Sequence, residues 1–413
     1  MSNKLTQHLH PGMRVFVPSM SNESVLLNQE LSLQPESANG VNFHTVQFPG
    51  IDRMDYIALH PHAKQSGYFM TPGLRLGLQQ NRANLFSLDY AGIKHHLLHG
   101  SAMDLAIAHI SSPDADGWCS PGLSCDFMPL VWSRAQKRVA HINPLMPRLP
   151  SSFRIHVSEL DDSVVSEQAL LNFKDPSQGD VENRISEWVA PLIRDGDTIQ
   201  FGIGSVPMGL AQALCNHRRL KFHGGLVSSA LQKLWNAGAM DRQARIVAGV
   251  VLGDESFREF VKEIPNLWLT DVRHTHDTET ISKIDGFVAI NSAIEVDLLG
   301  QVNAERSAGN LQAGSGGLPV FASGALAANQ GRLLICLPST ARKGTVSRIT
   351  PVLGNDAVCT LPRYMADTVI TEYGVASVRH LGPDARAKSL IDIAAPEHRA
   401  SLEQAWLEIR QKL

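Results

Sequence analysis

Two glycine clusters in the second half of the chain have the residue types and spacing of loops that bind an anion. Gly202-Ile203-Gly204 stands between the apolar run TIQF and a helical stretch that starts near Pro207. Glycines let the backbone pass close to a ligand, and the first N–H groups of a helix are available to an anion. The second cluster, Gly314-Ser315-Gly316-Gly317, could hold a phosphate or direct N–H groups at a thioester oxygen. By itself, each cluster also fits an ordinary tight turn or loop.

Polar residues upstream of the second cluster could orient a ligand. The segment INSAIEVDLLGQVNAE (290–305) places Glu295 and Asp297 in an otherwise apolar run. A buried carboxylate needs partners because its desolvation is costly, so bracing of a loop is the simpler role for both. Gln301 and Asn303 are neutral groups that could fix a polar ligand.

Three cations follow the next buried run. LPSTARKGTVSRI (337–349) carries Arg342, Lys343 and Arg348 after the apolar letters RLLIC. Cationic groups at the end of a strand suit a phosphate, although loop cations are commonly only solvated. Arg348 is therefore a candidate anion contact.

Histidines and cysteines do not form a metal-binding pattern. His95 and His99 are four residues apart and would share a helix face, but no glutamate stands between them as the HExxH pattern requires. The run HTHD (274–277) is a weaker candidate. The five cysteines are odd in number and scattered, with neither a CxxC pair nor a disulfide framework. We therefore expect no metal ion.

Length and composition narrow the class of protein. With 413 residues the chain is too long for one hydrophobic core. It is 43% hydrophobic and 19% charged, and its formal charge of −3 includes no block of like charges, which argues against a nucleic-acid partner. No apolar run approaches the ~20 residues that span a bilayer. The N-terminal letters MSNKLTQHLHPGM lack the apolar core of a signal peptide, so we expect a cytoplasmic protein.

Apolar runs alternate with amphipathic helical stretches along the chain. Examples of the expected strands are MDLAIAHI (103–110), RIVAGVVLG (245–253) and RLLICLP (332–338). This alternation predicts an α/β fold, and continuous apolar runs suit parallel sheets covered on both faces. The polar stretch FKDPSQGDVEN (173–183) is typical of a linker. We therefore expect two open α/β domains with largely parallel sheets, at residues 1–178 and 179–413.

The order and spacing of these segments resemble the acetyl-CoA hydrolase/transferase family, which includes acetate and 4-hydroxybutyrate CoA-transferases. The matching segments are DGDTIQFGIGSVP (195–207), INSAIEVDLLGQVNAE, AGSGG, LPSTARKGTVSRI and VITEYGVA (369–376), with SSPDADGWCSPGLSCD (111–126) and VAHINPLMPR (139–148) in the first half. The resemblance implies two CoA-transferase-like domains with acyl-CoA bound in the cleft between them. It also implies coenzyme A thioesters and a small carboxylate as substrates, and a homodimer or a hetero-oligomer.

The residue that does the chemistry in that family is replaced in this chain. The transferases carry a glutamate in a motif of the form H-[ST]-E-x-x-S-D-G, and its carboxylate forms an anhydride and then a glutamyl-CoA thioester. The matching segment is HGGLVSSA (223–230), in which Gly225 stands at the position of the glutamate. No residue within two positions of Gly225 carries a carboxylate. We therefore expect a reaction without a glutamyl-CoA intermediate.

Other residues are candidates for the remaining catalysis. His223 precedes the replaced position, where a neutral imidazole could assist a water, although packing is its simpler role. Glu23, Cys119 and Cys125 lie in regions that flank the cleft in the family and could act as nucleophiles. A structural role is the simpler one for each of these three residues.

The resemblance also suggests binding roles. Gly202, Gly204 and the 314–317 loop would lie along the CoA and its thioester, Gln301 and Asn303 would orient the acyl group, and Arg348 would contact an anion. We expect an acyl-CoA-dependent enzyme that transfers CoA directly or hydrolyses the thioester. Two alternatives stay open: a CoA-thioester-binding homologue or partner subunit without catalysis, and a conventional CoA-transferase with a relocated carboxylate.

Overall fold

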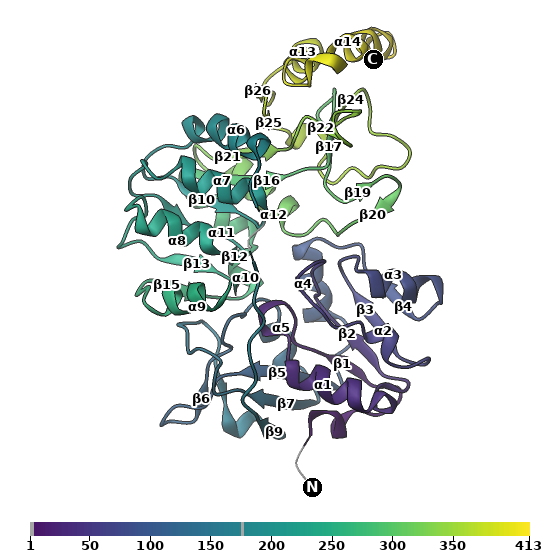
Figure 1. The fold of residues 1–413 in the computed structure, drawn as a ribbon, viewed down its shortest axis with the longest axis vertical. Coiled ribbons are helices and arrows are strands. Elements are labelled where there is room, and N and C mark those ends of the chain that lie inside the picture. Colours follow the sequence, from purple (N-terminus) through teal and green to yellow (C-terminus); the bar gives the residue numbers. More distant parts are fainter. Residues whose placement is uncertain (1–3, 175–176) are drawn as a thin grey trace. The chain divides into compact units, whose positions relative to one another are not determined.

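The computed structural model describes residues 4–174 and 177–413 (Figure 1). These residues form two compact units. Unit 1 comprises residues 4–174 together with Gly225–Val227 and Arg245–Thr275, and unit 2 comprises residues 177–224, Ser228–Ala244 and His276–Leu413. Asp175 and Pro176 of the expected linker lie outside the described residues. The division at residue 178 stays a prediction.

Unit 1 is built on a parallel sheet of seven strands. In spatial order they are β4 (Ala83–Leu85), β3 (Lys64–Gly67), β2 (Asn42–His44), β1 (Arg14–Phe16), β5 (Leu105–Ile110), β7 (Lys137–Ile142) and β9 (Asp162–Val165). Every neighbouring pair is parallel. All six residues of β5 are buried, as expected for a strand covered on both faces.

Helices complete unit 1, and several of them pack on this sheet. They are α1 (Val25–Leu33), α2 (Tyr56–Leu59), α3 (Pro72–Gln79), α4 (Tyr90–His99), α5 (Met128–Trp132), α9 (Glu255–Lys262) and α10 (Val272–Thr275). Leu27 and Leu31 of α1 pack against Val15, Leu105 and Val139 of the central strands, and all five side chains are buried. Burial of apolar area at the sheet is the main favourable term that holds these helices in place.

Short pairs of parallel strands form within the two later segments of unit 1, Gly225–Val227 and Arg245–Thr275. β12 (Leu226–Val227) pairs with β14 (Val250–Val251), and β13 (Ile246–Ala248) pairs with β15 (Leu267–Leu269). The expectation of one strand over 245–253 is wrong, because the chain changes pairing partners at Gly249 between β13 and β14.

Unit 2 contains a second, mostly parallel sheet. Its strands, in spatial order, are β11 (Lys221–Phe222), β10 (Thr198–Phe201), β16 (Phe287–Ser292), β21 (Arg332–Cys336), β25 (Thr368–Thr371) and β26 (Gly374–Ser377), of which β26 alone among these described strands is antiparallel to its neighbour. Its helices are α6 (Asp180–Val189), α7 (Ser205–Ala213), α8 (Ser229–Asn236), α11 (Thr278–Ser282), α12 (Leu318–Ala327), α13 (Pro383–Asp392) and α14 (Pro396–Arg410). The parallel sheets of the two units confirm the predicted α/β fold class. No helix in the described part of the chain is long and apolar enough to cross a membrane.

Candidate functional site

Three of the predicted segments lie at the carboxyl edge of the parallel sheet in unit 2. β10 leads into Gly202, β11 leads into His223, and β16 leads into the loop before Glu295. Parallel strands end at the same edge of a sheet, and ligands of open α/β sheets bind beyond that edge. Between β10 and β16, the Asn291 amide donates to Gln200 Oε1 at 3.0 Å, which ties the two strands together near their ends.

The first glycine cluster forms the turn from β10 to α7. Gly204 has φ of 133° and ψ of −179°, a conformation that L side chains rarely adopt, so glycine is required there. Within the described residues, no heavy atom lies within 4 Å of the point where a Cβ of Gly202 would stand. The backbone of this turn is therefore open to a close approach. Its predicted position along the CoA stays a prediction.

The second glycine cluster precedes α12. Gly316 has a φ of 60°, and a Cβ on Gly317 would lie 2.6 Å from the His276 imidazole. Because α12 returns the chain to the start of the parallel strand β21, the N-terminus of α12 lies toward the carboxyl edge of the sheet. Both clusters are thus associated with the same edge of the sheet and with helix N-termini.

His223 is buried at the end of β11. Only 4% of its surface is exposed, and its ring meets Phe287 edge-on with a centroid separation of 6.1 Å. Its backbone N–H donates to the Ile199 carbonyl at 3.3 Å. This packing is the simpler of the two roles considered for His223, and its assistance to a water stays a prediction.

Arg348 lies in a pocket of about 270 Å³ in unit 2 that also contains Arg306 and Arg342. The Arg348 side chain donates to the Ile294 carbonyl at a long 3.5 Å, and its buried Nε has no hydrogen-bond partner among the described residues. Glu295 and Asp356 also line the pocket. Three guanidinium groups against two carboxylates make this pocket a candidate site for a phosphate or another anion.

The predicted acyl-orienting amides are engaged within loops of unit 2. The Asn303 amide donates to Glu295 Oε1 and to the Arg306 carbonyl, both at 2.8 Å, while its oxygen accepts from the Glu305 and Arg306 N–H groups. The Gln301 amide donates to Asp297 Oδ2 at 2.7 Å. These bonds give Glu295 and Asp297 the bracing role expected of them. Contact of Gln301 and Asn303 with an acyl group stays a prediction.

In unit 1, Gly225 forms part of a hydrogen-bonded ladder. Its carbonyl oxygen accepts from Gly249 N at 2.9 Å and from Val250 N at 3.0 Å. On the other side, Cys125 N donates to the Gly249 carbonyl at 2.9 Å. Three segments far apart in the sequence, at 125, 225 and 249, therefore lie side by side.

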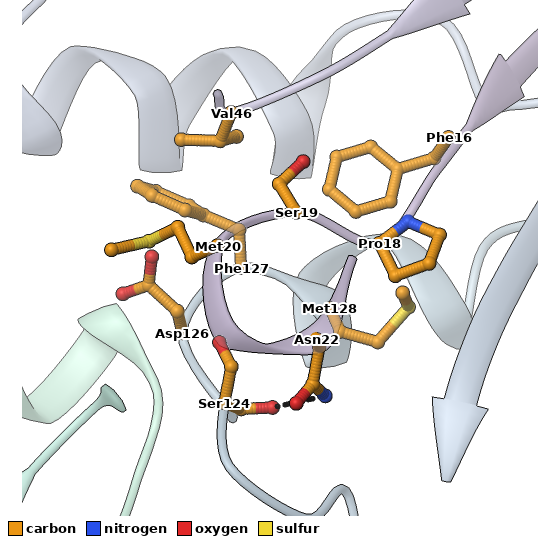
Figure 2. A pocket seen from close by; sticks show the side chains of 10 residues that line it. All are labelled: Phe16, Pro18, Ser19, Met20, Asn22, Val46, Ser124, Asp126, Phe127 and Met128. Atoms are coloured by element: carbon orange, nitrogen blue, oxygen red, sulfur yellow. Dashed lines mark hydrogen bonds between the residues drawn. The ribbon is translucent and has the colours of Figure 1, made fainter. Parts of the chain in front are cut away.

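Asp126 is a functional candidate that the sequence did not single out. It is 5% exposed and lines a small pocket of about 30 Å³, which Figure 2 shows. Its buried Oδ1 accepts no hydrogen bond from the described residues. Burial, and secondarily the negative charge of Asp271, raises the pKa of Asp126 to about 8. The available signal was one carboxylate in the otherwise uncharged run WCSPGLSCDFMPLVW (118–132).

Glu23 lies in a separate buried pair of carboxyl groups. Glu23 accepts from the Asn28 amide at 2.7 Å and from Arg53 N at 2.9 Å. The neighbouring Asp52 accepts from Met20 N, and burial together with the Glu23 charge raises its pKa to about 7. These bonds hold the loops before α1 and α2 together. A nucleophilic role for Glu23 stays a prediction.

The two cysteine candidates are buried thiols. Burial raises the pKa of Cys119 to about 11 and raises that of Cys125 further above its ordinary value. The nucleophile is the thiolate, which needs a lowered pKa. His95 and His99 lie together on α4 with ring centroids 4.6 Å apart, and the described residues contain no cluster of three or more His, Cys, Asp or Glu side chains that could hold a metal ion.

Comparison with known proteins gives the same family for both halves of the chain. The model of the acetyl-CoA hydrolase/transferase N-terminal domain matches residues 1–173, and that of the C-terminal domain matches residues 253–406. The 4-hydroxybutyrate coenzyme A transferase of Clostridium kluyveri is 37% identical over 73% of this chain and 71% of its own length. The succinyl-CoA:cyclohexane-1-carboxylate CoA transferase of Geobacter metallireducens is 32% identical, over 84% and 80% respectively.

A solved structure agrees with these matches. The crystal structure of RipA from Yersinia pestis superposes with a TM-score of 0.90 at 25% identity and covers 98% of this chain and 96% of that one. The fold is therefore that of a solved relative along almost its whole length. With two matching family models and a 37% identical relative, the chain belongs to the acetyl-CoA hydrolase/transferase family.

Proposed function

We propose that this protein is an acyl-CoA-dependent enzyme that hydrolyses a CoA thioester, or transfers its CoA directly to a carboxylate acceptor, without a glutamyl-CoA intermediate. The observation that carries the proposal is Gly225, which stands where the family motif has its glutamate. Without that carboxylate neither the acyl anhydride nor the glutamyl-CoA thioester can form at this position. Water or the acceptor must then attack the thioester itself.

The remaining groups have suitable chemistry for such a reaction. The turn with Gly202 and Gly204 and the 314–317 loop would lie along the CoA and direct N–H groups at the thioester oxygen. Arg348 and its neighbouring guanidinium groups would bind a phosphate of CoA. Coenzyme A enters as part of the substrate, and the reaction needs no metal ion. The working form is a cytoplasmic dimer.

The test is product analysis with a panel of acyl-CoA thioesters, each incubated with and without small carboxylates. Free CoA in the absence of an acceptor indicates hydrolysis, and a new acyl-CoA indicates transfer. Trapping with hydroxylamine or borohydride, followed by peptide mass spectrometry, should find no acyl or CoA adduct on the protein. An adduct on any glutamate would contradict the mechanism. A thermal shift with CoA but no turnover would assign the protein as a binding homologue instead.

A further inference from the structure

The geometry points to Asp126 as the acid–base residue of thioester hydrolysis, acting on water in the pocket of unit 1 next to the replaced position Gly225. This inference rests on the proposed function and deepens it, because it names the group that takes over the proton transfers. Asp126 is on the loop before α5, in a different part of the sequence from the family motif. Asp126 lines a pocket, has a carboxyl oxygen without a hydrogen-bond partner among the described residues, and lies beside the glycine backbone at 249.

The pocket is a mostly apolar hollow with a few polar atoms. Phe16, Pro18, Val46, Met20, Phe127 and Met128 supply its apolar surface, and Asp126 is a carboxylic acid on its wall. Figure 2 shows the Asp126 carboxyl group directed toward the Met20 side chain. The cavity volume is about 30 Å³, which has room for a water beside Asp126.

Two residues that line this pocket each have a buried oxygen atom without a hydrogen-bond donor among the described residues. Asp126 Oδ1 and Asn22 Oδ1 are both buried, and neither has a hydrogen-bond partner in the described part of the chain. The Asn22 side-chain nitrogen donates hydrogen bonds to backbone carbonyls, the shortest at 2.7 Å to Pro121. These bonds fix the orientation of the amide group. Buried polar atoms are normally hydrogen-bonded, so unpaired ones at a pocket mark a place for water or ligand.

The Asp126 carboxyl group also lies close to Gly249, whose N–H donates to the Gly225 carbonyl. A Cβ on Gly249 would lie 3.2 Å from Asp126 Oδ1 and 3.0 Å from the Gly225 carbonyl oxygen. The backbone of Gly249 therefore lies close to both Asp126 Oδ1 and the Gly225 carbonyl oxygen. Any side chain at this position would press against the carboxyl group, so a glycine here leaves room for Asp126 Oδ1.

The electrostatic surroundings favour a carboxyl group that exchanges protons near neutral pH. Asp271 raises the pKa of Asp126 in addition to burial, while Asp271 itself is paired with Arg273 at 2.8 Å. The other titratable groups that interact with Asp126 are Tyr90 of α4 and Cys125, and burial raises the pKa of both. All of these neighbours are negative or neutral, except the paired Arg273. A catalytic acid or base works best when its pKa lies near the working pH.

The proposed step conserves atoms and charge. The ionised Asp126 takes a proton from water while the water oxygen bonds to the thioester carbonyl carbon, and the carbonyl π electrons move onto the oxygen. When the carbonyl re-forms, the C–S bond breaks, and the proton on Asp126 passes to the departing CoA thiolate. Thioester and water thus become a carboxylic acid and the CoA thiol, and Asp126 returns to its carboxylate form.

Glu23 and Asp52, two other carboxyl groups of unit 1, are less suited to this role. Glu23 accepts from Asn28 and Arg53, and Asp52 accepts from the N–H groups of Met20 and Phe48 on separate oxygens. Using either group as a base would break bonds that hold these loops. Asp126 Oδ1 has no such bond to lose among the described residues.

The test compares the wild type with Asp126→Asn across pH 6 to 9.5, using the acyl-CoA that the wild type hydrolyses fastest. We expect wild-type kcat/KM to rise with pH and level off above about 8. The variant should lose roughly 10²- to 10⁴-fold in kcat and lose the pH-dependent limb, while its affinity for CoA, measured by calorimetry, stays within about twofold. The matched control is Glu30→Gln, which changes a buried carboxylate that accepts from Thr6, and it should leave the rate unchanged.

A second variant covers the case in which Asp126→Asn does not fold. Gly249→Ala places a methyl group against Asp126 Oδ1, and it should lower kcat by roughly 10²-fold while CoA binding is kept. An active wild type with a fully active, unchanged pH profile in Asp126→Asn overturns this inference but leaves the proposed function standing. A wild type that transfers CoA to a carboxylate yet never hydrolyses the thioester has the same consequence. A wild type inactive on every thioester overturns both.

Discussion

The amide nitrogen of Gly249 donates a hydrogen bond to the carbonyl oxygen of Gly225 at 2.9 Å, and neither residue carries a side chain. Gly225 is held in unit 1 through its backbone alone, because the same carbonyl also accepts from Val250 N. The backbone bonds at the replaced position therefore do not depend on the residue type. This makes the position suitable for restoring the family's carboxylate.

Gly225→Glu should convert the enzyme to the covalent route. Because the backbone bonds are independent of the side chain, the variant should fold, and its new carboxylate can attack the thioester. We expect an acyl or CoA adduct at position 225 after incubation with acyl-CoA, detected by hydroxylamine or borohydride trapping and peptide mass spectrometry. Gly225→Ala is the control and should give no adduct. A folded, CoA-binding Gly225→Glu protein without an adduct would contradict the assignment of this position.

Arg348→Ala should weaken the binding of substrates that carry the CoA phosphates. The guanidinium group lies in the three-arginine pocket with an unpaired buried Nε, so losing a charge-assisted contact should raise KM for acyl-CoA by roughly 10- to 100-fold. The matching acyl-pantetheine thioester lacks the nucleotide phosphates and should show little change. Lys388→Ala removes a cation on α13 that pairs with Asp392, and it serves as the control. An equal loss for both substrates would show that Arg348 does not bind a phosphate.

Strands buried on both faces were predictable from local letters. MDLAIAHI contains β5, and RLLICLP contains β21, because continuous apolar runs of this length have few alternatives in an α/β protein. The prediction of a single strand over RIVAGVVLG was wrong for a physical reason. Its apolar pattern is continuous, but the chain exchanges β15 for β12 as its partner at Gly249, and pairing over such distances is not encoded in a window of nine residues.

The site was only partly predictable for a similar reason. The glycine clusters and Arg348 could be identified from residue type alone, since loops that approach a phosphate need glycine and cations. Asp126 differs because its chemistry comes from burial beside Gly249, which exists only when the segments at 125, 225 and 249 pair. For Asn303 the sequence did not show that its amide group forms hydrogen bonds within its own loop, and its contact with a ligand stays a prediction.

Gly204→Ala should lower both stability and activity. The residue has φ of 133° and ψ of −179°, which a residue with a Cβ adopts only with strain of about 1–3 kcal/mol. Relief of this strain would move the turn and raise KM for acyl-CoA. Gly196→Ala is the matched control, since Gly196 has φ of 85° and open space around it in a turn at the other end of β10. Both variants should unfold at lower denaturant concentration, but Gly196→Ala should keep its KM.

Asp126→Asn should stabilise the protein at alkaline pH even though it impairs catalysis. In the folded state Asp126 keeps its proton up to about pH 8, whereas in the unfolded chain it loses the proton near its ordinary value of 3.8. Between these two values the unfolded state has released a proton that the folded state still holds, so raising the pH favours unfolding by roughly 1 kcal/mol per unit. The asparagine variant lacks this contribution.

The measurement is the free energy of unfolding by denaturant for both proteins at several pH values from 4.5 to 9.5. The advantage of the variant should be smallest at pH 4.5, grow as the pH rises, and become constant above about 8. Because Asp52 has a raised pKa in both proteins, its contribution cancels in the difference. A difference that does not change with pH would mean that Asp126 ionises normally in the folded protein, and the base for thioester hydrolysis would have to be another group.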